Sequence, residues 1–252
     1  MRGGSPIEMA AGRPAAVSAP AADDPPFFLW AQGARHAARL TGLRPVSLPL
    51  LLLFLLPLLA ACGAKEKAAP LPRGSTVLAL GDSLTAGYGL DPAQAWPALL
   101  AAATGWRIVN AGVSGDTSAG GLARLPALLD ANTPRLVLVA LGGNDMLRHL
   151  PEDETRANLA RIIALARSRG AHVVLLAIPK PSIAGAVFRS LSDAPFYDEL
   201  AREQGVPLLA GALADVLSDP DLKLDQLHPN AEGQHRLAEK LFDALSRLGF
   251  AS

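Results

Sequence analysis

From Thr76 onward, short apolar runs alternate with longer segments in which apolar residues recur at helical spacing. The apolar runs predict strands at residues 76–80, 107–110, 136–141, 172–178 and 207–209. The longer segments predict helices at residues 92–103, 118–130, 154–169, 195–204 and 231–248. The strand runs are apolar almost throughout, as expected of strands that helices cover on both faces. The pattern therefore predicts a single α/β domain, residues 76–252, with a doubly wound parallel sheet of about five strands.

A different pattern precedes this domain. Residues 48–61 form an apolar run that follows an arginine-containing segment and ends in small residues before Cys62. The run contains prolines and is shorter than the roughly 20 residues that a spanning helix needs. A basic segment, a short apolar segment and small residues before a cleavage point are typical of an export signal. We therefore expect residues 35–61 to be a signal peptide.

The end of this segment, Leu59-Ala60-Ala61-Cys62, resembles the lipobox of bacterial lipoproteins, in which the cysteine is lipidated and becomes the first mature residue. Gly63 follows where an aspartate would imply retention in the inner membrane. The resemblance implies an exported protein that is lipid-anchored to the outer membrane and faces the periplasm. The alternative is a plain signal peptide and a soluble periplasmic protein.

Two further segments flank the signal. Residues 62–75 are polar and contain proline, so they are expected to tether the lipidated cysteine to the domain. Residues 1–34 are rich in Ala, Pro and Gly without periodicity. They are expected to be either a disordered N-terminal extension or the product of a misassigned start of translation.

Ser83 is the first candidate for chemistry. It lies in Gly81–Gly89 (GDSLTAGYG), between the end of the first predicted strand and a glycine-rich turn, which is a suitable place for a nucleophile. The alternatives are a helix-capping serine and a second candidate nucleophile, Ser114. Neither serine lies in the Gly-x-Ser-x-Gly motif of the common α/β-hydrolases.

His228 is the candidate base. Asp225 lies three residues upstream in the loop before the last helix, where its carboxylate can reach Nδ1 and leave Nε2 free to accept a serine proton. The alternative is a helix-capping loop, and Asp221 is a second acid nearby but too distant for the same turn. The remaining histidines, His36, His149, His172 and His235, are assigned to the segment before cleavage, to the surface or to structural positions.

Gly115 and Asn144 are candidate oxyanion donors. Gly115 lies in a loop that leaves a strand and enters a helix, where its backbone N–H can approach a substrate oxygen. Asn144 follows two glycines at the end of an apolar strand, and its side-chain amide can point into a cleft. Together with the Ser83 amide they would form a three-donor oxyanion hole. Ordinary turn roles are the alternative for each residue by itself.

The four blocks GDSLTAGYG, SGDTS, GGND and DQLHPN resemble those of the SGNH (GDSL) hydrolases, especially the bacterial thioesterase I, lysophospholipase and arylesterase branch. The resemblance implies a flavodoxin-like α/β fold, with Ser83 as nucleophile and His228 as base oriented by Asp225. It also implies Gly115, Asn144 and the Ser83 amide as oxyanion donors. The lipobox departs from the soluble periplasmic members of that branch.

Composition and residue spacing limit the kinds of molecule that the protein is expected to bind. The 252 residues include 23 basic and 23 acidic side chains, without the concentrated basic patch that nucleic acid requires. No metal-ligand spacing is present, so we expect neither metal nor cofactor. The sequence therefore predicts a monomeric serine esterase that acts on small-molecule or lipid acyl esters or thioesters and is attached to a membrane through Cys62. The alternatives are a carbohydrate or peptidoglycan O-acetylesterase and a non-catalytic lipid-binding lipoprotein.

Overall fold

The computed structural model describes residues 69–182, 185 and 189–251. The expected N-terminal extension, the signal peptide and Cys62 lie outside these residues. Within the described part, Leu71 is buried and its amide donates to the carbonyl of Phe250 at 2.9 Å, so the end of the predicted tether packs on the domain. In the same part of the chain, none of the helices combines the length and the apolar character needed to cross a membrane.

A five-stranded parallel sheet lies at the centre of the domain. Its strands are β1 (Thr76–Gly81), β2 (Arg107–Gly112), β3 (Leu136–Ala140), β4 (His172–Leu176) and β5 (Leu208–Leu209). They are arranged in the order β2-β1-β3-β4-β5, and every pairing is parallel. The predicted α/β sheet is therefore confirmed. Because β2 and β3 lie on opposite sides of β1, the strand order reverses at β1, and ligands of open α/β sheets bind at the carboxyl ends of strands beside such a reversal.

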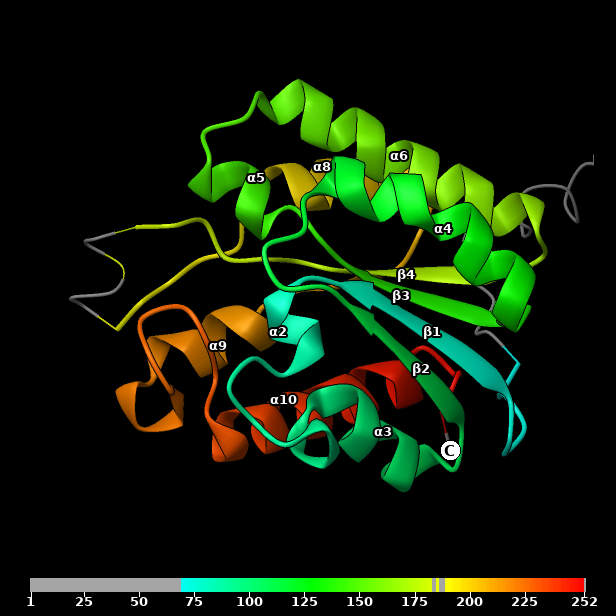
Figure 1. Cartoon of the computed structure of the whole chain (residues 1–252), viewed down its shortest axis with the longest axis horizontal. Coiled ribbons are helices and arrows are strands. Elements are labelled where there is room, and N and C mark those ends of the chain that lie inside the picture. The colour runs from blue at the N-terminus through cyan, green and yellow to red at the C-terminus, as the bar shows by residue number, and fades with distance from the viewer. Residues whose placement is uncertain (1–68, 183–184, 186–188, 252) are drawn as a thin grey trace, which may run out of the picture. The chain divides into compact units, whose positions relative to one another are not determined.

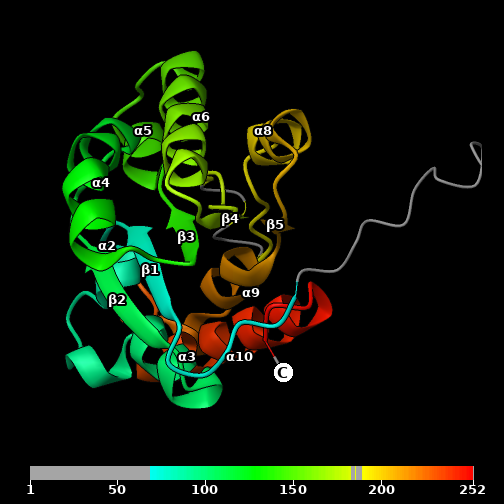
Figure 2. The ribbon, with the colours of Figure 1, turned by 90° about the vertical axis from the view of Figure 1, so that its right-hand side faces the viewer.

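Helices cover both faces of the sheet (Figure 1). One group consists of α4 (Ser118–Asn132), α5 (Gly143–Leu147), α6 (Glu152–Ser168) and α8 (Phe196–Gln204). The other consists of α2 (Ser83–Ala86), α3 (Trp96–Thr104), α9 (Ala212–Ser218) and α10 (Ala231–Arg247). Figure 2 shows the same two groups from the side, and β3 between them is buried along its whole length. Covering helices explain why its sequence has no polar alternation.

The predicted helix at residues 92–103 is two elements. Pro92–Gln94 forms a 3₁₀ turn, Ala95 is extended with ψ 142°, and α3 begins at Trp96. Pro97 explains the break, because proline has no backbone N–H and is tolerated in the first turn of a helix but not in its interior. Three short helices, α2, α5 and α9, were not predicted, and the other predicted boundaries differ by a few residues.

Candidate active site

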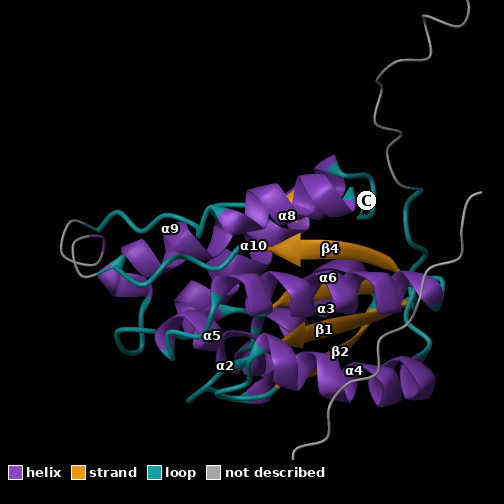
Figure 3. Cartoon of the chain, turned by 90° about the horizontal axis from the view of Figure 1, so that it is seen from above, coloured by secondary structure: helices purple, strands orange, loops and turns teal. Residues whose placement is uncertain are grey.

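Ser83 opens α2 directly after β1, at the end of the sheet toward which the strand arrows point (Figure 3). The turn before it requires glycine at position 81, because a Cβ there would lie 2.0 Å from Oγ1 of Thr85. Asp82 caps the helix by accepting the Leu84 amide at 3.0 Å. The local sequence thus ends the strand and begins one helical turn with Ser83 at its first position.

Ser83, His228 and Asp225 form a continuous hydrogen-bonded chain. The Nε2 atom of His228 lies 2.9 Å from Oγ of Ser83, and its Nδ1 atom lies 2.8 Å from Oδ2 of Asp225. Oδ1 of Asp225 also accepts the amides of Leu227 and His228 at 2.7 and 2.8 Å. Partial burial raises the pKa of Asp225, but the hydrogen bonds from His228 and Leu227 outweigh it and hold the pKa below its usual value. The carboxylate therefore stays charged beside the imidazole.

In the described part of the structure, the side chains of the competing candidates do not join this chain of hydrogen bonds. Ser114 lines the same cavity as Ser83, but among the described residues its hydroxyl makes no hydrogen bond to a histidine. Asp221 lies in a 3₁₀ turn, where its carbonyl accepts Nδ2 of Asn230 at 2.8 Å. The structure thus pairs Asp225, and not Asp221, with His228.

The loop that carries His228 is held against α2 and α3. The Leu224 amide donates to the carbonyl of His228 at 2.8 Å, which closes the loop on itself. Gln234, buried in the first turns of α10, donates to the carbonyl of Leu84 at 3.2 Å and accepts the amide of Trp96 at 2.8 Å. These bonds fix the distance between the histidine loop and the serine turn, and the sequence analysis did not identify Gln234.

The three expected oxyanion donors line one cavity. Ser83, Gly115 and Asn144 all contribute to it, together with His228. Gly115 has a φ of +79°, and its carbonyl accepts Nη2 of Arg148 at 2.5 Å. Within the described part of the chain, neither the Ser83 amide nor the Gly115 amide is engaged by an acceptor. Both remain available to a ligand oxygen.

This cavity has a volume of about 610 Å³ and a largely apolar lining. A cavity of this size suits a small organic ligand rather than a single water or ion. The Tyr88 ring borders it and lies on the imidazole of His228, with ring centroids 4.5 Å apart. The other apolar side chains of the lining are Leu84, Leu147, Ile178, Pro179, Pro181, Leu191, Leu217 and Leu227.

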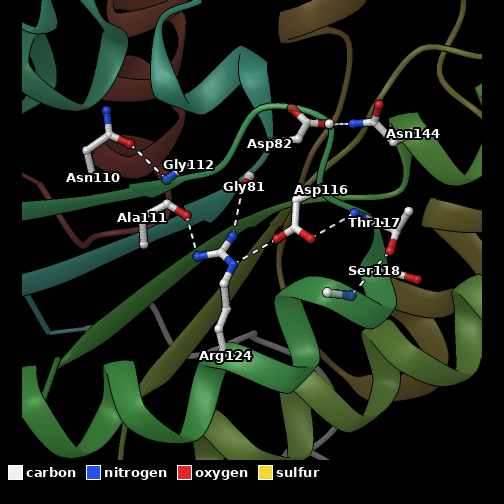
Figure 4. A network of polar contacts seen from close by, with 12 residues as sticks. Gly81, Asp82, Asn110, Ala111, Gly112, Asp116, Thr117, Ser118, Arg124 and Asn144 are labelled. Atoms are coloured by element: carbon white, nitrogen blue, oxygen red, sulfur yellow. Dashed lines mark hydrogen bonds and ion pairs between the residues drawn. The ribbon is translucent and has the colours of Figure 1, made fainter.

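Arg124 on α4 connects β1, β2 and the loop before α4 (Figure 4). Its guanidinium donates to Oδ2 of Asp116 at 2.8 Å, to the Ala111 carbonyl at 2.7 Å and to the Gly81 carbonyl at 2.9 Å. Each of these three hydrogen bonds has a charged donor and is therefore stronger than a hydrogen bond between neutral groups. One side chain therefore joins the carboxyl ends of β1 and β2 to the loop that precedes α4.

The positions of these partners matter for the site. Gly81 is two residues before Ser83, and Asp116 directly follows Gly115. The guanidinium of Arg124 consequently holds the two backbone segments whose amides face the cavity. Sequence reasoning did not identify Arg124, because its partners are brought to it by the parallel pairing of β1 and β2.

Asn144 is held from two sides. Its Nδ2 atom donates to Oδ2 of Asp82 at 3.2 Å (Figure 4). Its neighbour Asp145 is buried and accepts the amide of Ser118 at 2.9 Å, the hydroxyl of Ser118 at 2.5 Å and the hydroxyl of Thr155 at 3.3 Å. These bonds connect α5 to α4 and α6. The side chain of Asn144 is thereby fixed at the edge of the cavity.

Comparisons with known proteins agree with this arrangement. Residues 79–236 match the GDSL-like Lipase/Acylhydrolase family. An arylesterase from Vibrio mimicus is 41% identical over 172 residues, which cover 65% of this chain and 84% of the relative. Thioesterase 1/protease 1/lysophospholipase L1 from Escherichia coli strain K12 is 41% identical over 178 residues, which cover 69% of this chain and 84% of the relative.

A solved structure agrees as well. The crystal structure of TesA is 40% identical, superposes with a TM-score of 0.62 and covers 69% of this chain and 99% of its own. The family match, residues 79–236, includes the loops that bring the four sequence blocks to one cavity. The chain belongs to the GDSL-like lipase/acylhydrolase family.

Proposed function

We propose that this protein is a serine esterase that hydrolyses acyl esters or thioesters through an acyl-enzyme on Ser83. The observation that carries the proposal is the hydrogen-bonded chain of Ser83, His228 and Asp225 at the edge of an apolar cavity. A serine hydroxyl is a weak nucleophile at neutral pH unless a base removes its proton, and the imidazole is within hydrogen-bond distance to do so.

The reaction would proceed in two halves. Nε2 of His228 takes the Ser83 proton as Oγ attacks the carbonyl carbon, and the amides of Ser83 and Gly115 with Nδ2 of Asn144 bind the oxyanion. His228 then gives the proton to the leaving alcohol or thiol. Water, deprotonated by the same imidazole, attacks the acyl-enzyme and releases the acid. Asp225 keeps Nδ1 protonated and the ring in orientation throughout.

The apolar cavity supports an acyl substrate. Its volume of about 610 Å³ exceeds what an acetyl group needs, which favours longer acyl chains over the O-acetylesterase alternative. The relatives named arylesterase and thioesterase 1/lysophospholipase L1 support carboxylic esters and thioesters as the substrate class.

We also propose that the protein is exported and anchored through lipidated Cys62, facing the periplasm from the outer membrane. The support is the lipobox-like Leu59–Cys62 segment with Gly63 after it. The catalytic domain would then act as a monomer on esters that reach the membrane surface.

A fluorophosphonate probe tests the enzymatic function, because it reacts with serines activated by a base. Wild type should be labelled and should hydrolyse a p-nitrophenyl acyl series. Ser83→Ala should lose the label and lower kcat by about 10³-fold or more with the fold intact. Ser114→Ala is the matched control, since it removes a serine of the same cavity whose hydroxyl makes no hydrogen bond to His228 among the described residues. Loss of labelling in Ser114→Ala alone would refute the assignment.

A further inference from the structure

Asp82 is a buried carboxyl that the proposed reaction does not use. It lies next to Ser83 in the chain and is 1% exposed. Oδ1 accepts the Leu84 amide at 3.0 Å, and Oδ2 accepts Nδ2 of Asn144 at 3.2 Å. Capping a four-residue helix needs the first of these bonds but not the second. The bond to Asn144 connects the turn between β1 and α2 to α5 and therefore calls for a separate explanation.

The bond decides which way the amide of Asn144 faces. The nitrogen and the oxygen of an asparagine side chain have nearly the same shape, so rotation by about 180° exchanges a donor for an acceptor. A carboxylate can only accept hydrogen bonds. With the amide flipped, the Asn144 oxygen would lie against a carboxylate oxygen and the two would repel. The nitrogen therefore faces Asp82, and its second hydrogen is available to a ligand in the cavity that Asn144 lines.

We propose that Asp82 is a positioning residue that keeps the amide nitrogen of Asn144, rather than its oxygen, available to the oxyanion. This inference rests on the proposed esterase function, because only a negatively charged intermediate makes the orientation matter. An amide oxygen facing the oxyanion would repel it, so molecules with the flipped side chain would turn over slowly.

The protonation state of Asp82 enters this role. Burial raises its pKa from 3.8 to about 6, although its hydrogen bonds and the nearby His228 oppose the shift. Once protonated, the carboxyl can donate to the Asn144 oxygen, so the flipped amide is no longer excluded. Other charged or titratable groups lie in this region: Asp82 contributes to the raised pKa of Tyr197 on α8, Arg124 on α4 donates to the carbonyl of the preceding Gly81, and Lys180 and Lys223 line the same cavity.

Steady-state kinetics on p-nitrophenyl butyrate can test the role through a double-mutant cycle. Asp82→Asn should lower kcat by about ten-fold with KM nearly unchanged, because an amide partner no longer excludes the flipped Asn144 and cannot hold the productive orientation with a charge-assisted hydrogen bond. In the Asn144→Ala background the same substitution should change kcat by less than about two-fold, since Asp82 acts through Asn144. Asp91→Asn is the matched control: Asp91 caps another turn through Ala93 and should leave kcat unaltered.

Additive effects of the two substitutions on kcat would refute the role of Asp82. A wild type that is neither labelled by fluorophosphonate nor active would instead refute the esterase function on which this role rests. A second measurement needs no variant of Asp82. The kcat of wild type should fall at acid pH more steeply than one ionisation allows, because Asp82 becomes protonated in addition to the general base of the reaction. Asn144→Ala should restore the slope of a single ionisation. An acid limb of equal slope in both proteins would refute the proposal.

Discussion

The buried carboxyl of Asp82 should make the protein less stable as pH rises. Its pKa is about 6 in the folded chain against an ordinary value of 3.8, with burial as the main cause. Between these values the folded state binds more protons than the unfolded state, so the free energy of unfolding falls with rising pH. One pKa unit corresponds to about 1.4 kcal/mol, so a shift of roughly two units amounts to about 3 kcal/mol. This stabilisation is complete below pH ~4 and is lost above pH ~6.

Urea denaturation of wild type and Asp82→Asn across this pH range isolates the effect. Titrating groups that do not interact with Asp82 are shared by the two proteins, so their contributions cancel in the difference between the free energies of unfolding. The free energy of unfolding of wild type minus that of Asp82→Asn should decrease by about 3 kcal/mol between pH ~3.5 and pH ~7.5. Any constant cost of placing an asparagine in this site cancels in the same way, because only the change with pH is compared.

Parallel stability curves would refute this reasoning. They would mean that Asp82 titrates near its ordinary value in the folded chain, and that its burial is relieved in solution. The second step expected in the acid limb of kcat would then have no source. A difference of the predicted size would show that a destabilising charge is retained beside the nucleophile, as expected where a site is built for chemistry rather than stability.

Four further results are expected. Asn144→Ala should lower kcat by about 10²-fold with KM nearly unchanged, because an oxyanion donor acts in the transition state; a change in KM alone would assign Asn144 to substrate binding. Asp225→Asn should lose most turnover while Asp221→Asn keeps it, measured as kcat/KM, and the reverse ranking would contradict the pairing with His228. Arg124→Gln should lower the free energy of unfolding, measured in urea, by about 2 kcal/mol or more and should also reduce kcat, because the carbonyls of Gly81 and Ala111 lose a charged donor. An unchanged free energy of unfolding and an unchanged kcat would contradict the role of Arg124 in holding the two strand ends together. Cys62→Ala should abolish palmitate labelling and membrane partitioning in a Gram-negative host, and a wild type that is unlabelled and soluble would leave only the plain signal peptide.

The sheet and the cluster of site residues could be predicted because both depend on short-range pattern. Apolar runs mark strands that are buried on both faces, and parallel strands place all their carboxyl ends at one edge. Residues that follow different strands, such as Ser83, Gly115 and Asn144, therefore had to lie near one another. The prediction that Asp225 reaches Nδ1 of His228 needed only a three-residue turn.

The features that the sequence did not predict depend mainly on contacts between residues far apart in the chain. The bond from Asn144 to Asp82 spans 62 positions and that from Arg124 to Gly81 spans 43, so no local pattern indicates either. The helices α2 and α5 span four and five residues, too few for a helical period to be visible. The contribution of Leu217 to the cavity could not be predicted either, because it depends on where α9 packs relative to the sheet end.

The three hydrogen bonds of Arg124 divide the cavity into a fixed part and an adjustable part. The guanidinium holds the backbone next to Ser83 and Gly115, whereas Ile178, Pro181 and Leu217, which form part of the apolar wall, are not among its hydrogen-bond partners in the described residues. Substitutions in that wall can therefore reshape the space for an acyl chain without displacing the reacting atoms. Directed evolution of chain-length preference should find its tolerated changes there, while the neighbourhood of Arg124 should resist substitution.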